Sequence, residues 1–176
     1  MNYRLIQTKR GYCGILFENE LVHRILQPDS NQNLMRRIES DFAFAKASKT
    51  GLQEVASFLV DFHAGKDVTL SMEHVDVSRC TPFQLSVLNA ERRIPRGMTA
   101  SYSWVASKVG TKAFRAVGNA LATNPFPFVV PCHRSVRNDG SIGKYQGGPE
   151  MKRSLLEMEG VVFGDNGRVR TECILR

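Results

Sequence analysis

The chain has 176 residues, 42% of them hydrophobic, which is enough for one or two small packed domains. No apolar run approaches the roughly 18 residues that a membrane-spanning helix needs, and residues 1–20 lack the pattern of a secretory signal. The four cysteines are far apart and form no CxxC pair, which argues against a disulfide scaffold and leaves open a single disulfide. A reducing cytoplasmic setting, or a nuclear one in a eukaryotic source, is therefore expected.

The net charge of +7 is unevenly distributed along the chain. Residues 1–79 carry ten basic and ten acidic side chains, whereas residues 80–176 carry fourteen and seven, so the whole excess lies in the C-terminal part. A polyanionic partner such as DNA is one interpretation, because Lys and Arg displace counterions from phosphates. A basic surface that only confers solubility is the other, and charge alone does not separate them.

Residues 1–78 have the pattern of a mixed α/β domain. Strands are predicted at Tyr3–Thr8, Cys13–Phe17 and Leu21–Leu26, and apolar residues then recur at helical spacing over 34–45 and 55–62.

The histidines of this part are too scattered to favour a metal centre. A zinc site containing Cys13 and His23 remains an alternative to ordinary core or surface roles.

A second domain, residues 79–176, is expected to begin with a helix. Thr81-Pro82-Phe83-Gln84 has the form of a capping box with proline at the first helical position, and Ile94-Pro95-Arg96-Gly97 ends the segment.

Two short helices should follow and form a helix-turn-helix candidate. Ser101 can cap a helix that ends at Gly110, and Thr111 can cap another that runs from Lys112 to about Ala122.

The second of these helices has two distinct faces. Phe114, Val117 and Leu121 fall on one side, which we expect to be the core side, and Arg115 and Asn119 fall on the other. Many helical hairpins bind nothing, so this pattern alone does not establish DNA binding.

An apolar stretch over residues 126–131 should be buried, and Cys132-His133-Arg134 follows it. A thiol is a good nucleophile only as thiolate, and a neighbouring base or cation lowers its pKa. For an isolated Cys-His pair, a buried and inert cysteine is the alternative.

The surrounding motifs extend well beyond this pair. Residues 124–134 read Asn-Pro-Phe-Pro-Phe-Val-Val-Pro-Cys-His-Arg, and Gly143-Lys144-Tyr145-Gln146-Gly147-Gly148 follows. Together with Arg115-Ala116-Val117-Gly118 and Leu155-Leu156-Glu157-Met158-Glu159-Gly160, this region resembles the O6-alkylguanine-DNA alkyltransferase family over about residues 80–163.

The resemblance implies an α/β (α+β) architecture. Residues 1–78 would form an RNase-H-like mixed α/β domain, and residues 79–176 a mostly helical catalytic domain with a winged helix-turn-helix. The wing would turn at Asn138-Asp139-Gly140.

The resemblance also implies a function. Such proteins enter the minor groove of double-stranded DNA, rotate O6-alkylguanine (and O4-alkylthymine) out of the stack, and move the alkyl group irreversibly to a cysteine. The protein would act once, as a suicide alkyltransferase and a monomer, with no metal, no cofactor and no membrane partner.

Five residues match the catalytic positions of the family. Cys132 would be the acceptor, His133 a base acting through water, and Glu159 the carboxylate that orients this histidine. Tyr145 would assist departure of the guanine, and Asn124 would fix the turn around the active site.

A further set matches positions that contact DNA or the flipped base. Arg115 would fill the space left by the extruded base, Tyr102 would hydrogen-bond the guanine, and backbone groups of Ser135 and Gln146 would read its edge. The set also includes Ala116 and Asn119 on the outer face of the helix, together with Gly118 and Leu121.

Two departures concern the size of the pocket. Ser135 stands where the family usually has an apolar residue, and Gln146 where it often has a small one, so tolerance of bulky alkyl groups is in question.

Two other classes of protein are alternatives to an alkyltransferase. A DNA-binding regulator, or a relative that flips lesions without removing them, would not need Cys132. A cysteine hydrolase would need an oxyanion hole, of which the sequence gives no sign.

Overall fold

The computed structural model describes all residues, 1–176, and divides into two compact units. The first comprises residues 1–79 together with 125–129, and the second comprises residues 80–124 and 130–176. No helix is long and apolar enough to cross a membrane.

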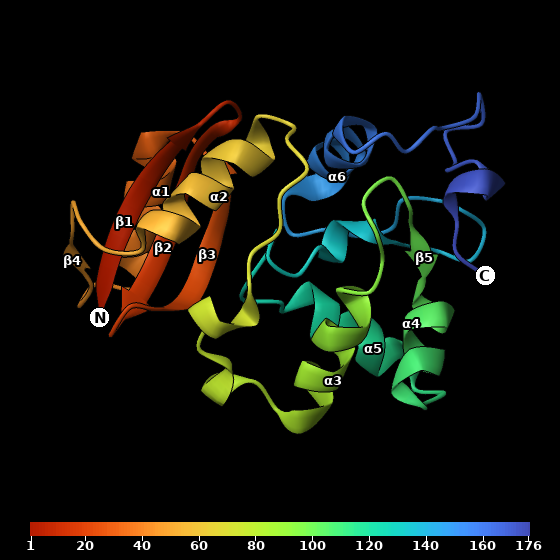
Figure 1. Ribbon diagram of the computed structural model, residues 1–176, viewed down its shortest axis with the longest axis horizontal. Coiled ribbons are helices and arrows are strands. Elements are labelled where there is room, and N and C mark those ends of the chain that lie inside the picture. The colour runs from red at the N-terminus through yellow and green to blue at the C-terminus, as the bar shows by residue number, and fades with distance from the viewer. The chain divides into compact units, whose positions relative to one another are not determined.

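Most regular elements of the first unit precede residue 64 (Figure 1). In chain order they are β1 (Asn2–Thr8), β2 (Gly11–Glu18), β3 (Leu21–Asp29), α1 (Asn31–Asp41), β4 (Lys46–Ala47) and α2 (Gln53–His63), followed by single 3-10 turns at Met72–His74 and Val77–Arg79.

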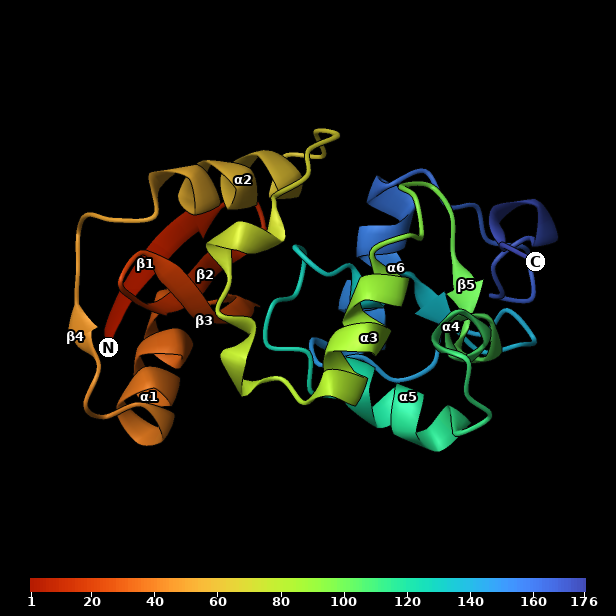
Figure 2. The ribbon, with the colours of Figure 1, turned by 60° about the horizontal axis from the view of Figure 1, so that its bottom comes forward.

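The strands form one sheet in the order β3-β2-β1-β4, with β4 parallel to β1 and the other pairs antiparallel. The views agree that α1 and α2 cover opposite faces of this sheet (Figure 2). Both faces of β2 are therefore buried: Leu16 packs with Leu34 and Ile38 of α1, while Cys13 contacts His63 of α2. This explains why the interior of β2 is continuously apolar rather than alternating.

Residues 125–129 complete the core of the first unit. The carbonyl of Pro125 accepts a hydrogen bond from the Ile25 amide at 2.8 Å, and the Phe128 ring packs against Phe62 and His63. Phe126 and Phe128 are buried, as the apolar sequence predicts.

The second unit contains the remaining elements. They are α3 (Pro82–Glu91), β5 (Ala100–Ser101), α4 (Tyr102–Val109), α5 (Phe114–Ala122), a 3-10 turn (Cys132–Arg134), β6 (Ser135–Val136), α6 (Gly148–Met158) and a final 3-10 turn (Thr171–Cys173).

The predicted helix starts are confirmed for α3 and α4. The Thr81 hydroxyl accepts from the Gln84 amide at 3.1 Å, and the Ser101 hydroxyl accepts from the Trp104 amide at 3.1 Å. The reciprocal half of the capping box does not form, because the Gln84 side chain instead donates to the Thr123 hydroxyl at 3.1 Å.

The second helix of the hairpin departs from expectation in two ways. It begins at Phe114 rather than Lys112, because the Thr111 hydroxyl accepts from the Ala113 amide and holds these residues in a turn before the helix. Phe114 is 51% exposed rather than part of the core, since burial on α5 starts one turn later, at Val117.

A small apolar cluster closes the C-terminal part of the second unit. Val136 and Leu156 pack with Val161, Val169 and Cys173. The parallel pair β5–β6 lies next to this cluster and brings Ser101, the cap of α4, into register with Val136. The start of α4 and the segment after Cys132 are thereby held side by side.

Candidate active site

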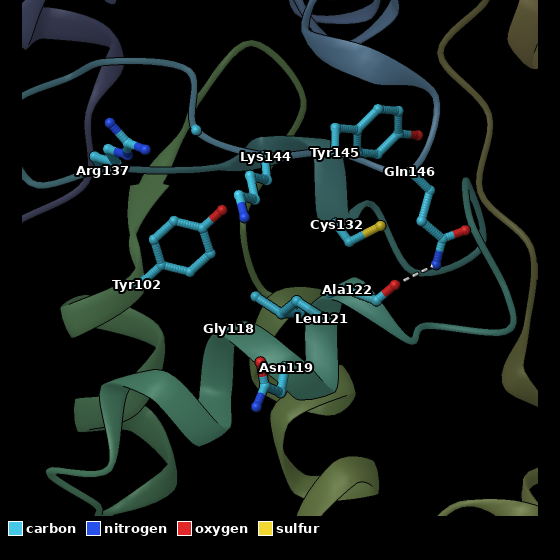
Figure 3. Close-up of a pocket in the computed structure, with 11 residues that line it drawn as sticks. Tyr102, Gly118, Asn119, Leu121, Ala122, Cys132, Arg137, Lys144, Tyr145 and Gln146 are labelled. Atoms are coloured by element: carbon cyan, nitrogen blue, oxygen red, sulfur yellow. Dashed lines mark hydrogen bonds between the residues drawn. The ribbon is translucent and has the colours of Figure 1, made fainter.

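A pocket of about 490 Å³ opens in the second unit (Figure 3). It is lined by Tyr102, Gly118, Asn119, Leu121, Ala122, Cys132, Arg137, Gly143, Lys144, Tyr145 and Gln146. These residues come from α4, α5, the turn that holds Cys132 and the loop before α6, so segments far apart in sequence form its walls.

Cys132 lies at the bottom of this pocket. Pro131 precedes it and starts the 3-10 turn Cys132–Arg134, and the sulfur points into the cavity between Tyr145 and Ala122. Burial raises the pKa of the Cys132 thiol to about 11, against the opposing effect of a hydrogen bond from the Asn124 side chain. The thiolate is therefore the minor form at neutral pH, and the reaction needs a base.

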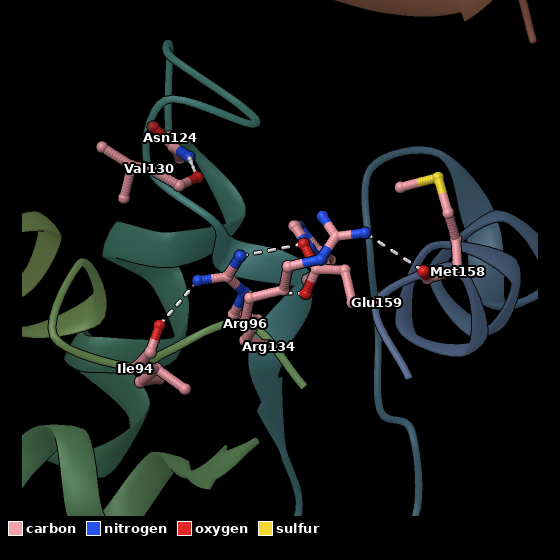
Figure 4. Close-up of polar contacts among 8 residues, drawn as sticks. Ile94, Arg96, Asn124, Val130, Arg134, Met158 and Glu159 are labelled. Atoms are coloured by element: carbon pink, nitrogen blue, oxygen red, sulfur yellow. Dashed lines mark hydrogen bonds and ion pairs between the residues drawn. The ribbon is translucent and has the colours of Figure 1, made fainter. Parts of the chain in front are cut away.

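His133 and Arg134, which follow Cys132 in the chain, form one cluster with Glu159, and Figure 4 shows the Arg134–Glu159 part of it. The carboxylate of Glu159 accepts from His133 Nε2 at 3.0 Å and from Arg134 Nε and Nη2 at 2.8 and 2.9 Å. Arg134 Nη1 also donates to the carbonyl of Ile94 at 2.6 Å. His133 and Arg134 therefore face Glu159, which explains why they do not lower the pKa of Cys132 as the sequence led us to expect.

The cluster fixes the proton on one nitrogen of His133. Although burial opposes ionisation of Glu159, the hydrogen bonds it accepts from His133 and Arg134 and the charge of Arg134 lower the pKa of this carboxyl to about 2. Because an ionised carboxylate only accepts hydrogen bonds, Nε2 of His133 carries the proton. Burial also lowers the pKa of His133, so the ring is neutral and Nδ1 is the nitrogen through which it can take a proton.

Asn124 anchors the segment that leads to Cys132. Its Nδ2 donates to the carbonyl of Val130 at 3.0 Å, and both residues are buried (Figure 4). On another side of the cluster, Arg96 Nη2 donates to the carbonyl of Met158 at 3.2 Å, next to Glu159.

The loop before α6 forms one wall of the pocket. Gln146 Nε2 donates to the carbonyls of Ala122 and Asn124 at 2.6 and 3.2 Å, which ties the loop to the end of α5. The Tyr145 ring lies edge-on to His133 with 6.5 Å between the ring centroids.

The structure brings most of the predicted site residues together. Seven line the pocket: Tyr102, Gly118, Asn119, Leu121, Cys132, Tyr145 and Gln146. Three others are buried: Asn124, His133 and Glu159.

Three predicted residues lie elsewhere. Arg115 is exposed and Ala116 half-buried near the start of α5, outside the pocket. Ser135 is buried, and its hydroxyl donates to Glu91 Oε2 at 2.6 Å, so its side chain does not set the size of the cavity. Gln146, the other residue that departs from the family pattern, does line the pocket.

Four charged residues of the site were missed from the sequence. Arg137 and Lys144 line the pocket, and Glu91 and Lys152 are completely buried near it. Arg137 directly precedes the predicted wing turn, and Lys144 lies within the Gly-rich loop. Their positions next to these motifs could have identified them from the sequence. Nothing in the local pattern of Glu91 distinguishes it from a solvated helix residue.

The zinc alternative is not supported in the first unit. Cys13 Sγ lies 3.5 Å from His63 Nε2, whereas His23 Nδ1 lies 3.1 Å from Asp76, so Cys13 and His23 have different partners. No group of three or more His, Cys, Asp or Glu side chains is placed to hold a metal ion. None of the four cysteines is in a disulfide.

Comparison with known proteins agrees with this geometry. The sequence model of the DNA binding domain of 6-O-methylguanine DNA methyltransferase matches residues 82–161, the segment that contains the pocket and the Glu159 cluster.

One curated relative and two solved structures extend the match. The methylated-DNA–protein-cysteine methyltransferase of Methanothermobacter thermautotrophicus is 42% identical over 127 residues, which is 72% of this chain and 69% of the relative. The O6-methylguanine methyltransferase of Mycobacterium tuberculosis has a TM-score of 0.76 at 29% identity, covering 90% of this chain and 92% of that one. Its complex with DNA has a TM-score of 0.77 at 28% identity, covering 91% and 93%. The chain belongs to the methylated-DNA–protein-cysteine methyltransferase family.

Proposed function

We propose that this protein repairs DNA by transferring the alkyl group of O6-alkylguanine, and of O4-alkylthymine, to Cys132. The observation that carries the proposal is that Cys132 lines a pocket of about 490 Å³ while the next residue, His133, is buried and paired with Glu159 at 3.0 Å. Single bases with a small alkyl group fit a cavity of this size.

The chemistry requires one proton transfer and one displacement. His133, oriented by Glu159, takes the thiol proton of Cys132 through a water molecule. The thiolate then forms a bond to the alkyl carbon while the bond from that carbon to O6 breaks, and the guanine keeps the electron pair and is protonated, assisted by Tyr145. The product is a thioether, which is a poor leaving group, so each molecule acts once, without metal or cofactor.

DNA would be bound through the helix pair α4–α5, acting as a winged helix-turn-helix in the minor groove. The alkylated oxygen is out of reach inside a duplex, so the nucleotide must be rotated out of the stack. Arg115 is exposed near the start of α5, where it can occupy the vacated space, and Ala116 and Gly118 keep that face of the helix small. The net charge of residues 80–176 suits a phosphate backbone.

The same proposal covers the remaining expectations. The first unit would be the RNase-H-like domain of the family, the protein would act as a monomer, and its place of action is the compartment that contains the DNA.

Intact-protein mass after incubation with duplex DNA containing O6-methylguanine tests the transfer. We expect one added methylene per molecule, located on the peptide that contains Cys132, with no further turnover in excess substrate. Cys132→Ser should abolish the mass change and retain binding to the lesion.

Two outcomes would contradict the proposal. Unchanged mass with tight lesion binding by the parent protein would favour a protein that flips bases without repairing them, and catalytic hydrolysis of an ester would favour a hydrolase. Loss of DNA binding in the Cys132→Ser variant would assign Cys132 a structural role instead.

A further inference from the structure

A second buried polar cluster lies next to the acceptor and takes no part in the mechanism above. Glu91, Ser135 and Lys152 are all completely buried. The Ser135 hydroxyl donates to Glu91 Oε2 at 2.6 Å, and Lys152 Nζ donates to the Ser135 carbonyl at 2.5 Å. The other carboxyl oxygen, Glu91 Oε1, is buried and has no hydrogen-bond partner.

This arrangement lowers the stability of the fold, so its presence indicates a function. A carboxyl group away from water with one unsatisfied oxygen lowers the stability of the fold, and an apolar side chain would fill the same place at the end of α3. Ser135 follows Cys132 by three residues, so whatever holds Ser135 also holds the turn that presents the thiol.

The charge of Glu91 affects the pKa of Cys132. Beyond burial and the hydrogen bond from Asn124, an ionised Glu91 raises the pKa of Cys132, and it does so more strongly than Lys152 lowers it. Burial, and after it the charge of Glu91, also raises the pKa of Tyr102 in the pocket wall.

We propose that Glu91 is a positioning residue for alkyl transfer that holds Ser135 behind the pocket and, through its own charge state, sets how readily Cys132 gives up its proton. For its physiological meaning this inference rests on the proposed function, and it adds to that function a buried group that controls the reactivity of the acceptor.

The titration of Glu91 falls in the physiological range. Burial raises the pKa of Glu91 to about 7, opposed by the hydrogen bond from Ser135 and by the charges of Lys152 and Arg134. Above this pH Glu91 is negative and disfavours a second negative charge on Cys132. Below it Glu91 is neutral and no longer raises the pKa of Cys132.

The charged groups around Glu91 come from every neighbouring element. The turn after residue 131 contributes Cys132 and Arg134, α6 contributes Lys152, and α4 contributes Tyr102. Burial lowers the pKa of Lys152 to about 8, so it is still a cation where Glu91 begins to ionise. The only charged residue of α5, Arg115, is exposed.

The experiment measures the rate at which iodoacetamide alkylates Cys132 between pH 5 and pH 9, followed on the Cys132 peptide by mass spectrometry. Glu91→Gln keeps the shape and removes the charge. At pH 7.5 we expect Cys132 to react about threefold or more faster in Glu91→Gln than in the parent protein, since one pKa unit is tenfold in thiolate. At pH 5.5 the two rates should agree, because Glu91 is then neutral in both.

Ser135→Ala supplies a matched test, because it removes the hydrogen bond that favours the ionised form of Glu91. This variant should also react faster than the parent at pH 7.5, by a smaller factor. In the Glu91→Gln background the same substitution should change the rate by a smaller factor than in the parent protein, since residue 91 can no longer ionise and only the positioning effect is left. An equal factor in both backgrounds, or a Glu91→Gln rate equal to or below that of the parent at pH 7.5, would overturn the proposal.

The parent protein gives a measurement that needs no variant. Its rate should rise less than tenfold per pH unit around pH 7, where Glu91 ionises, and more steeply below that range; a tenfold rise per unit throughout would overturn the proposal. Because iodoacetamide reports on the thiol alone, failure of the protein to accept a methyl group from DNA would refute the proposed function without affecting this result.

Discussion

Glu159 illustrates how one carboxylate can organise a site. It receives three hydrogen bonds from His133 and Arg134 in a place where its side chain is fully buried. Such a cluster stabilises the fold only while all its members are present, because removing one partner leaves the others buried and unsatisfied.

Glu159→Gln should therefore lower the free energy of unfolding by about 3 kcal/mol at pH 7 and slow alkyl transfer. The pKa of Glu159 is about 2 in the folded protein and ordinarily near 4.5, so its stabilising effect is fully present above pH 4.5 and is lost as the pH falls towards 2. The difference between parent and variant in urea unfolding should shrink between pH 5 and pH 3.

Glu157→Gln is the matched control for that series. Glu157 pairs with Arg153 at 2.8 Å on the surface of α6, with both side chains well exposed, so its loss should cost less than about 0.5 kcal/mol. A Glu159→Gln difference that did not change with pH would show that the cluster contributes through shape rather than charge.

At the residue scale, the sequence predicted that His133 and Glu159 meet, as they do at 3.0 Å, but it did not predict that the pKa of Cys132 is raised. The Pro-Cys-His-Arg motif fixed which side chains meet, since the turn and its partner at residue 159 belong to one continuous family pattern. It did not reveal that Arg134 faces Glu159 rather than Cys132, because the direction of a long side chain depends on acceptors that only the fold supplies, such as the Ile94 carbonyl. Glu91 was missed for the same reason.

Helix α5 and the turn before it contain two glycines in open space that differ in backbone geometry. A Cβ added to either Gly110 or Gly118 would meet nothing within 4 Å, but Gly110 ends α4 with φ of +77° while Gly118 lies inside α5. Any difference between alanine substitutions at these positions therefore comes from the backbone alone.

Gly110→Ala should destabilise the protein by about 1 kcal/mol, because a side chain strains the left-handed conformation. Gly118→Ala should stabilise it by about 0.5 to 1 kcal/mol through helix propensity. Both are measured by chemical denaturation. Since Gly118 lines the pocket, Gly118→Ala should also repair duplex DNA more slowly. An unchanged repair rate would show that Gly118 does not face the DNA.

The loop before α6 offers a second prediction at this scale. Gln146→Glu keeps the side-chain length but loses the amide that donates to the Ala122 and Asn124 carbonyls. Amide hydrogens of residues 143–147 should exchange faster with solvent in this variant, and the rate of benzyl transfer should rise relative to methyl transfer. Equal exchange in variant and parent would show that Gln146 does not hold the loop.

Elements were predictable where their signals are local. The caps at Thr81 and Ser101 fixed the starts of α3 and α4, and the strands of the first unit follow from their apolar pattern. The late start of α5 was not predictable, because Thr111 can cap a helix or close a turn with the same hydroxyl, and packing decides between them.

At the scale of the whole molecule, we expect the position of its charge to govern how it binds DNA. Arg137 and Lys144 line the pocket within the part of the chain that carries the entire net charge. If they contact phosphates that flank the lesion, their loss should weaken binding and also its dependence on salt.

The double variant Arg137→Gln with Lys144→Gln should reduce the slope of log affinity against log salt by about two, one for each lost phosphate contact. Lys46→Gln with Lys49→Gln removes the same charge from exposed positions of the first unit and should leave the slope unchanged. Equal slopes for the two double variants would mean that net charge alone, rather than these positions, attracts the DNA.

The assignment of residues 125–129 to the first unit has a consequence for synthesis. When the first 79 residues have left the ribosome, their sheet and helices still lack the ring of Phe128 and the carbonyl of Pro125 that bonds to Ile25. The N-terminal part can therefore finish folding only after residues 80–124, about half of the second unit, have been translated. The segment just ahead of Cys132 therefore ties completion of the core of the first unit to synthesis of the second.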